Sequence, residues 1–455
     1  MVGQRRREAS TAGRREPLDT GRSGLLDLKR IRDDPEAVKA ALARRGAAGA
    51  VDELLRLDQR RRELLPRVEG GRARQNEASE AIAEAKREGR EAEGEIAEMR
   101  ELATEIKALE GELAEVERER DELALTLPNL PDPDAPEGET EEDAAVVREV
   151  GERPSFEFEV RDHLELGERW GVIDMERAAR ASGSRFAYLM GDLVAVELAL
   201  VRFALGLLSD EGFTPVVPPV LVREPALEGT GFFPGEREMI YEVPRDELFL
   251  VGTSEVSLAA LHMDEILAAD EVPRRYAGFS TCFRREAGAA GKDTRGIFRV
   301  HQFDKVEMFS FVEPQSSREE HERLLGLQER ILQSLEIPYR VVDVATGDLG
   351  AAAARKFDCE AWIPSQERYR ELTSCSNTTD FQARRLGCRY RPEEGASAVH
   401  LHTLNGTAVA VGRTLIAIME NRQDADRRIS VPAVLHEHGA PAAIPSENES
   451  EGDRR

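Results

Sequence analysis

Residues 51–127 form a long stretch that is dominated by Glu, Arg, Ala and Leu and contains one proline, Pro66. In its second half, apolar residues follow alternating steps of three and four, with Arg120 as the one break: Met99, Leu102, Ile106, Leu109, Leu113, Val116 and Leu123. A matching apolar series in the first half consists of Leu54, Leu57, Leu64, Val68, Ala78, Ile82 and Ala85. This spacing predicts two long helices, each with one apolar side.

The segment "KREGREAEG" between the two series places Gly89 where the chain can turn. Two helices joined by a short turn form an antiparallel hairpin that buries both apolar sides against each other. At about 1.5 Å per residue, helices of roughly 40 residues would reach about 60 Å, which is far longer than a compact domain. We therefore expect the hairpin to protrude as an arm.

The first helix of this hairpin carries a concentration of positive charge, whereas the second is richer in Glu. The arginines concerned are Arg56, Arg60, Arg61, Arg62, Arg67, Arg72 and Arg74. This asymmetry offers a basic face on an otherwise acidic protein. An ordinary solvated coiled-coil face, or a stalk that binds a partner protein, would explain the same composition.

Charge and composition limit the remaining function classes. The net charge of −25 argues against non-specific binding to nucleic acid or to an anionic membrane, so we expect neither a DNA partner nor a membrane. The longest apolar run, residues 193–208, is interrupted by Glu197 and Arg202 and predicts a buried helix. The cysteines form no CxxC pair, which predicts a reduced, cytoplasmic protein without structural zinc: Cys282, Cys359, Cys375 and Cys388.

A chain of 455 residues should divide into two or three units. Residues 1–24 are Arg-rich and lack an apolar core, so we interpret them as a disordered extension, or as a misassigned start with Leu25 as the true beginning. The helical arm spans 25–127, and the Pro-rich acidic segment 128–150 is predicted as a linker. Irregular alternation of helix and strand signals over 151–438 predicts an α+β domain, and 439–455 is predicted to be disordered.

The stretch "FRREAGAAGKDTRGIFRVHQFDKVEMF", residues 283–309, sets a small-residue loop between two strand-like runs. Two adjacent antiparallel strands would bring Arg284, Glu286, Arg299, Phe303 and Glu307 close together. An arginine fork suits phosphate, an aromatic ring can stack on a base, and a carboxylate can accept a hydrogen bond from an amine or bind an ammonium group. Taken singly, each residue is more often structural: an arginine on a strand usually forms a surface ion pair, and Phe303 would more often belong to the core.

Two further clusters carry candidate chemistry. In "RELTSCSNTTDFQARR", Glu371, Thr373 and Ser374 combine a carboxylate with hydroxyls, which suits Mg²⁺ held between protein and phosphate oxygens. A polar turn with local hydrogen bonds is the alternative. In "HTLNGTAVAVGRTLIAIMENRQ", Arg413 lies in an otherwise apolar run and therefore needs an anionic partner, either a carboxylate or a ligand phosphate.

These segments carry a family resemblance. Residues 283–309 resemble motif 2 of class II aminoacyl-tRNA synthetases, "GTAVAVGRTLIAIMENRQ" resembles motif 3, and "EGFTPVVPPVLV" resembles motif 1, which in that class contributes to the dimer interface. "LVGTSEVSLAALH", "ELTSCSNTTDFQARR", "HTLNGT" and the long hairpin are similar to bacterial seryl-tRNA synthetases specifically. The resemblance covers about residues 25–435 in order. It implies an antiparallel class II sheet flanked by helices, with a coiled-coil arm.

The resemblance implies that the chain forms an aminoacyl adenylate from ATP and serine. Arg284 would hold the α-phosphate and the serine carboxylate, Glu286 the adenine amine, Phe303 the adenine face and Arg413 the γ-phosphate. Glu371 and Ser374 would bind Mg²⁺. The full ATP-binding set implied in this way is Arg284, Arg285, Glu286, Arg299, Phe303, Glu371, Leu372, Thr373, Ser374 and Arg413.

For serine, the resemblance implies that Glu307 binds the ammonium group, while Glu255 and Thr407 recognise the hydroxyl. The implied set is Thr253, Ser254, Glu255, Arg284, Glu307, Asn405 and Thr407. This sequence has Arg285 and Thr407 where the family often has serine, and Ser254 where it often has alanine.

In the family, the arm of one subunit of a homodimer grips the long variable arm of serine tRNA, and the resemblance leaves open whether a selenocysteine tRNA is also a substrate. The implied contacts are Arg60, Arg61, Arg67, Arg72 and Arg74. Two other functions are alternatives: a related enzyme that transfers the amino acid to a carrier protein or small molecule, and a non-catalytic binding protein. The intact arm counts against the first, and the retained motif residues count against the second.

Overall fold

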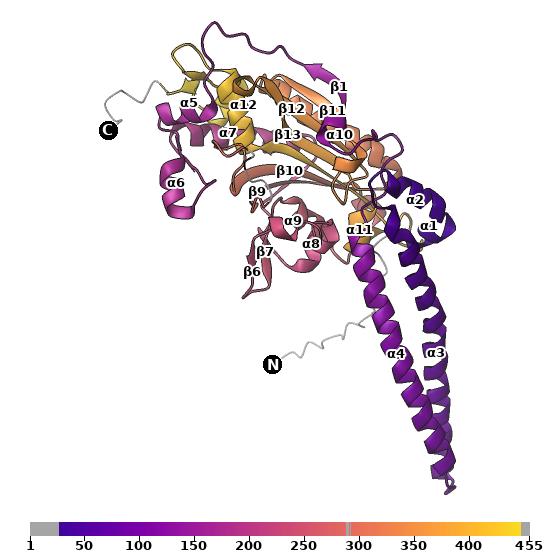
Figure 1. The fold of residues 1–455 in the computed structure, drawn as a ribbon. Coiled ribbons are helices and arrows are strands. Elements are labelled where there is room, and N and C mark those ends of the chain that lie inside the picture. The colour runs from indigo at the N-terminus through magenta and orange to yellow at the C-terminus, as the bar shows by residue number, and fades with distance from the viewer. Residues whose placement is uncertain (1–26, 288–290, 292, 447–455) are drawn as a thin grey trace, which may run out of the picture.

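The computed structural model describes residues 27–287, 291 and 293–446. Figure 1 shows a long helical hairpin that projects from a body built of a sheet and helices. Predictions for residues 1–26 and 447–455 lie outside the described residues.

The hairpin consists of α3 (Val51–Arg87) and α4 (Glu93–Thr126), which lie side by side and antiparallel. Gly89, in the turn between them, has a positive φ of 72°. Gly71 allows close packing, because a Cβ there would lie 2.8 Å from a side-chain carbon of Ile106. Arg120, the break in the apolar series, is buried and forms an ion pair with Asp121. The predicted coiled-coil arm is confirmed.

The base of the arm packs on two short helices and on the body. Helices α1 (Leu28–Asp33) and α2 (Pro35–Ala43) lie beside the base of the hairpin (Figure 1). Phe381, from α11 (Phe381–Arg385), joins their apolar cluster. The hairpin contributes Val51, Leu54, Ala124 and Leu127 to that cluster.

The body is built on an eight-stranded sheet in the order β1-β11-β12-β13-β16-β10-β9-β4. β4 runs parallel to β9, and every other neighbouring pair is antiparallel. The strands are β1 (Ala145–Val150), β4 (Thr214–Val216), β9 (Arg274–Phe283), β10 (Gln302–Val312), β11 (Tyr339–Asp343), β12 (Arg355–Ile363), β13 (Arg368–Asn377) and β16 (His402–Ala410). The predicted α+β class is confirmed.

Helices cover one face of this sheet and leave room for a cavity on the other. Helices α7 (Asp192–Asp210), α10 (Ser317–Ser334) and α12 (Val411–Asn421) share the main apolar cluster with sheet residues such as Val306 and Met308. The predicted buried helix is therefore present as α7. Successive strand residues point to opposite faces, so Lys305 and Glu307 of β10 point away from this layer.

Smaller elements complete the body. The remaining helices are α5 (His163–Arg169), α6 (Met175–Ser182), α8 (Glu224–Thr230) and α9 (Glu255–Ala259). The short strands are β2 (Ile173–Asp174), β3 (Tyr188–Leu189), β5 (Leu221–Val222), β6 (Glu242–Val243), β7 (Leu248–Leu250), β8 (Ile266–Leu267), β14 (Arg389–Tyr390), β15 (Val399–His400), β17 (Ile429–Ser430) and β18 (Ala443–Ile444). Within the described ranges, no helix is long and apolar enough to cross a membrane.

Two predicted boundaries differ from the structure. The segment 128–150 is not purely a linker, because Ala145–Val150 is an edge strand of the main sheet. Upstream of this strand, the Asn129 side chain donates to the carbonyls of Ala352 and Thr378. The predicted disordered tail from residue 439 starts too early, because β18 pairs with β17. Both segments are rich in Pro or polar residues, so their local sequence does not indicate a strand. The short strands that form there are stabilised by tertiary contacts.

Candidate active site

One cavity of about 340 Å³ gathers most of the predicted site residues. Its walls come from the open face of β10, β13 and β16, from the segments beyond the ends of β9 and β10, and from residues 349–353. The predicted residues that line it are Thr253, Glu255, Arg284, Glu286, Arg299, Phe303, Glu307, Glu371, Leu372, Ser374, Asn405, Thr407 and Arg413.

Three predicted residues do not line the cavity. Ser254 and Thr373 are buried, and Arg285 is exposed. Thr373 is excluded because the pairing of β13 with β12 shifts by one residue between Glu371 and Thr373. This irregularity brings Glu371 and Ser374 to the cavity side together, although they are three positions apart and a regular strand would place them on opposite faces.

At one end of the cavity, charged and hydroxyl groups converge on Glu307. Lys305 Nζ lies 2.9 Å from Glu307 Oε2 and donates to Thr253 Oγ1 at 2.8 Å. Thr407 Oγ1 donates to the same carboxylate oxygen at 3.1 Å. Both Lys305 and Glu307 are less than a tenth exposed. A small ligand with an ammonium group and a hydroxyl fits the polarity of this end.

A second carboxylate, Glu255, faces the same end from α9. Its Oε1 accepts hydrogen bonds from Gln382 Nε2 at 2.8 Å and from Asn405 Nδ2 at 2.9 Å. Burial, followed by the negative charge of Glu307, raises the pKa of Glu255 to about 7. This end of the cavity thus combines the ion pair of Lys305 and Glu307 with a second carboxyl group, Glu255, that titrates near neutrality.

The middle of the cavity combines an arginine with an aromatic ring. The Arg284 guanidinium carbon lies 5.4 Å from the centre of the Phe303 ring, and Arg284 Nε donates to the carbonyl of Gly252 at 3.1 Å. Glu286 accepts from Arg299 at 3.0 Å. Strand β9 ends at Phe283, and strand β10 begins at Gln302. Arg284, Glu286 and Arg299 therefore lie on the segment that connects the two strands rather than on the strands themselves.

The far end of the cavity is strongly cationic. Arg413 donates to the Glu371 carbonyl at 3.0 Å and lies 3.3 Å from its carboxylate, so the carboxylate partner anticipated for Arg413 is Glu371. Burial acts to raise the pKa of Glu371, but the positive charges of Arg413, Lys356 and Arg284 outweigh it and lower the pKa to about 2. Such an environment favours a polyanionic ligand.

The residues at this end fit a divalent cation that is shared with a phosphate ligand. Glu371 and Ser374 offer two oxygen ligands, and Mg²⁺ usually combines one or two carboxylates with phosphates and water. Asp358, opposite Ser374 on β12, is buried and its Oδ1 has no hydrogen-bond partner among the described residues. No group of three or more His, Cys, Asp or Glu side chains that could hold a metal alone occurs in the described ranges.

Two family models match the chain: residues 25–131 match the seryl-tRNA synthetase N-terminal domain, and residues 240–422 match the tRNA synthetase class II core domain (G, H, P, S and T). A serine–tRNA ligase from Acidothermus cellulolyticus is 54% identical over 415 residues, which cover 91% of this chain and 98% of that protein. The chain belongs to the seryl-tRNA synthetase family.

Other members of the family agree in sequence and in fold. A serine–tRNA ligase from Streptomyces coelicolor is 51% identical over 419 residues, which cover 90% of this chain and 96% of that protein. The crystal structure of the seryl-tRNA synthetase from Pyrococcus horikoshii, complexed with ATP, has a TM-score of 0.86 and 41% identity over 92% of this chain and 99% of that one. The predicted family and class II architecture are confirmed.

Several residues of this family member were missed by sequence reasoning. Lys305 was overlooked because a lysine on a strand usually faces solvent, and its position two residues before Glu307 was the available signal. Lys356 and Gln382 line or support the cavity from distant elements. The Phe298 ring lies 4.8 Å from the Arg413 guanidinium carbon. No local pattern marked these last three residues.

The basic face of the family member's arm is partly neutralised. Arg60 pairs with Glu112, and Arg61 and Arg72 each lie 2.7 Å from a glutamate of α4. Arg67 and Arg74 form no ion pair with another described residue, and they flank a shallow hollow that includes Gly70 and Gly71. Among the five arginines implied as RNA contacts, Arg67 and Arg74 are therefore the ones that no described glutamate already neutralises.

Replacing Glu255 with glutamine should make stability less dependent on pH. A carboxyl group whose folded pKa is about 7 stabilises the fold below its unfolded pKa, and that stability is lost as pH rises toward 7. We therefore expect the melting temperature of Glu255→Gln, relative to wild type, to be higher at pH 8 than at pH 5. Thermal melts at both values test this, with exposed Glu238→Gln as the control. If the melting temperatures of Glu255→Gln and wild type differed by the same amount at both pH values, the raised pKa of Glu255 would be contradicted.

Proposed function

We propose that the protein activates L-serine with ATP and transfers the serine to the 3′ end of serine tRNA. The observation that carries the proposal is that one continuous cavity joins an end suited to a hydroxyl and an ammonium group to a cationic end suited to phosphates. The names of the family members, serine–tRNA ligases, support the same reaction.

In this proposal, the serine ammonium binds Glu307 and Thr253, and the serine hydroxyl binds Glu255 and Thr407. Asn405 orients the Glu255 carboxylate through its hydrogen bond. Polar groups buried around a hydroxyl would be left unpaired by alanine, which predicts strong discrimination, of about 10⁴ or more. Threonine has the hydroxyl and is rejected only by the room that its methyl group needs, so its rejection is weaker.

ATP lies along the rest of the cavity. Phe303 stacks on the adenine, Glu286 accepts from its amino group, Arg299 holds Glu286, and Arg413 binds the terminal phosphate. Arg284 contacts the serine carboxylate and the α-phosphate together. It holds the attacking oxygen near phosphorus and neutralises charge while the new P–O bond forms and pyrophosphate leaves, so the chemistry depends on orientation and electrostatics rather than on a protein nucleophile.

Mg²⁺, held by Glu371 and Ser374, supplies charge neutralisation on the phosphates when it is bound. The low pKa of Glu371 keeps its carboxylate ionised across the physiological range, ready for a cation or for Arg413. Arg413 and Lys356 provide permanent positive charge from the protein itself.

The arm provides the tRNA contacts in this proposal. Its length of 37 residues in α3 gives a rigid rod of about 55 Å, which can reach a distant part of an RNA fold. Arg67 and Arg74 contact the RNA backbone, and Arg60, Arg61 and Arg72 exchange their glutamate partners for phosphate. We also propose that the protein acts in the cytoplasm as a homodimer that contacts its partner through the motif 1 segment, where Val217 is 83% exposed.

Amino-acid-dependent exchange of pyrophosphate into ATP tests the proposal, with serine, threonine, alanine and glycine in parallel. We expect exchange with serine, little with threonine and none with alanine or glycine. Transfer of serine to tRNA in the same preparation then tests the second step. Exchange without transfer to tRNA would favour the carrier-protein enzyme, and folded protein without exchange would favour a binding protein.

A further inference from the structure

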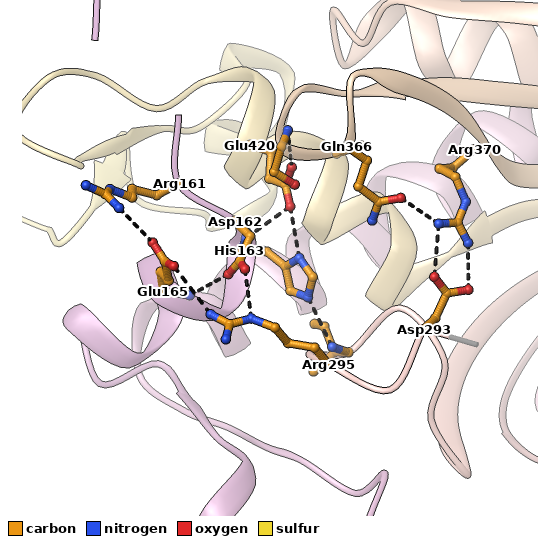
Figure 2. A network of polar contacts seen from close by, with 12 residues as sticks. Arg161, Asp162, His163, Glu165, Asp293, Arg295, Gln366, Arg370 and Glu420 are labelled. Atoms are coloured by element: carbon orange, nitrogen blue, oxygen red, sulfur yellow. Dashed lines mark hydrogen bonds and ion pairs between the residues drawn. The ribbon is translucent and has the colours of Figure 1, made fainter. Parts of the chain in front are cut away.

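A buried histidine–glutamate pair joins four segments of the chain, and its central contact is drawn in Figure 2. His163, the first residue of α5, and Glu420, near the end of α12, are 4% and 0% exposed. Glu420 Oε1 lies 2.9 Å from His163 Nδ1 and accepts from the His163 backbone N–H at 3.0 Å. Its Oε2 accepts from the backbone N–H of Ser365 at 3.1 Å. Both carboxylate oxygens are therefore fixed.

The other ring nitrogen of His163 defines where the proton lies. Nε2 lies 3.1 Å from the backbone nitrogen of Ile297, which donates to it. An amide N–H can only donate, so Nε2 carries no proton, and the ring proton lies on Nδ1, where it is donated to Glu420. The imidazole thus links the Glu420 carboxylate to the main chain at Ile297.

The main chain is shaped to come this close to the imidazole. Gly296 has a positive φ of 71°, and a Cβ at this position would lie 2.0 Å from His163 Nε2. Any other residue would therefore displace the ring or the loop. The short distance between the main chain and the imidazole therefore explains why Gly296 occupies this position in "TRGIF".

Ion pairs hold the same loop on either side of the imidazole. Arg295 lies 2.9 Å from Asp162 and 3.4 Å from Glu165. Asp293 binds Arg370 at 2.7 Å. Figure 2 shows these pairs flanking the His163–Glu420 contact. They are more exposed than the central pair, so the buried imidazole provides the contact with the least freedom.

The anchored residue leads directly into the cavity wall. Ile297 lines the cavity, and the next residue, Phe298, lies against Arg413 and, at 4.0 Å, against Arg370. Arg299 then binds Glu286. A shift at Ile297 would move all of these groups, whereas the serine pocket lies at the other end of the cavity.

We propose that His163, held by Glu420, is a positioning residue for ATP: its Nε2 fixes the main chain at Ile297 and thereby the adenine and phosphate contacts that follow. The inference rests on the proposed function, because it assigns the nucleotide to this half of the cavity. The positioning effect of His163 acts on ATP binding alone and leaves serine binding unchanged.

Two substitutions separate the two halves of the imidazole. In His163→Asn, the amide nitrogen can replace Nδ1 toward Glu420, but nothing reaches Ile297. In His163→Gln, the amide oxygen can replace Nε2 as the acceptor for Ile297. We expect His163→Asn to weaken ATP binding by about five- to tenfold, the size of one lost hydrogen bond, and His163→Gln to stay within about twofold of wild type.

Calorimetric ATP binding, the KM for serine and the melting temperature are measured for wild type and both variants, together with hydrogen exchange of the peptide that contains Ile297. The expected result is weaker ATP binding and faster exchange at Ile297 in His163→Asn alone, with an unchanged KM for serine. Equal ATP binding in all three proteins would overturn the inference. The inference would also fail if the variants bound both ATP and serine more weakly in proportion to their fall in melting temperature. Wild type that binds ATP but shows no serine-dependent exchange would instead count against the proposed function.

Discussion

Replacing Arg284 with alanine should lower serine-dependent pyrophosphate exchange by about 10²- to 10³-fold or more, because in the proposed reaction this one side chain neutralises charge on both reactants. The hydrogen bond from Nε to the Gly252 carbonyl and the nearby Phe303 ring orient its guanidinium group. Among the described residues, no group accepts a hydrogen bond from the two terminal nitrogens of Arg284, Nη1 and Nη2. These nitrogens are therefore available to the proposed reactants, and the alanine variant would lose that charged contact.

Arg285→Ala is the matched control, because the neighbouring arginine is exposed and does not line the cavity. Arg284→Lys keeps the charge but loses the planar fork, so we expect an intermediate rate. Exchange rates and melting temperatures should be measured for all three variants. Full exchange activity in Arg284→Ala, or equal losses in Arg284→Ala and Arg285→Ala, would remove Arg284 from the proposed role.

Shortening the arm should separate the two steps of the reaction. We propose deleting residues 66–111 and joining Leu65 to Glu112 through a short glycine-rich turn. The cluster at the base, which includes Val51, Leu54 and Phe381, lies outside the deletion, so the body should keep its fold. Adenylate formation should stay within about twofold of wild type, whereas transfer to tRNA should fall on the order of 10²-fold or more, because several phosphate contacts are lost together.

The full-length variant Arg67→Gln/Arg74→Gln tests whether charge on the first helix accounts for this loss. Arg118→Gln on the second helix is its control, since Arg118 is paired with Glu115 and Glu122. We expect the double variant to impair transfer to tRNA, with the largest difference from wild type at low salt and a smaller one at higher salt, and the control to behave as wild type. If the shortened protein loses adenylate formation as strongly as transfer, the arm and the body are not separate in function.

The sequence predicts the arm well because its information is local and repeated. Apolar residues such as Leu57, Leu64 and Leu113 recur at helical spacing and are all buried in the structure. The strands β9 and β10 are predicted for a related reason, since each carries its own strand-like pattern and the two follow one another in the sequence, although residues 284–301 connect them. Edge strand β1 is missed because its partner, β11, lies about 190 residues further along the chain, a pairing that no local pattern reveals.

The candidate site was predictable where motifs carry the chemistry and less so where the fold supports it. Arg284, Glu307 and Arg413 were singled out from the sequence, and the cavity brings them together. His163 and Glu420 are separated by 257 positions, so only the folded chain shows their contact. The register shift in β13 likewise depends on pairing with β12, so the sequence does not show that Thr373 points away from the cavity.

Helix α11 has a consequence for how sequence variants will be interpreted. Phe381 belongs to the base of the arm, and the next residue, Gln382, binds Glu255 in the proposed serine pocket. A substitution in this five-residue helix will disturb both regions at once. Genetic defects that map there should therefore combine altered amino-acid selection with altered tRNA use, and they cannot be sorted into one class or the other by position alone.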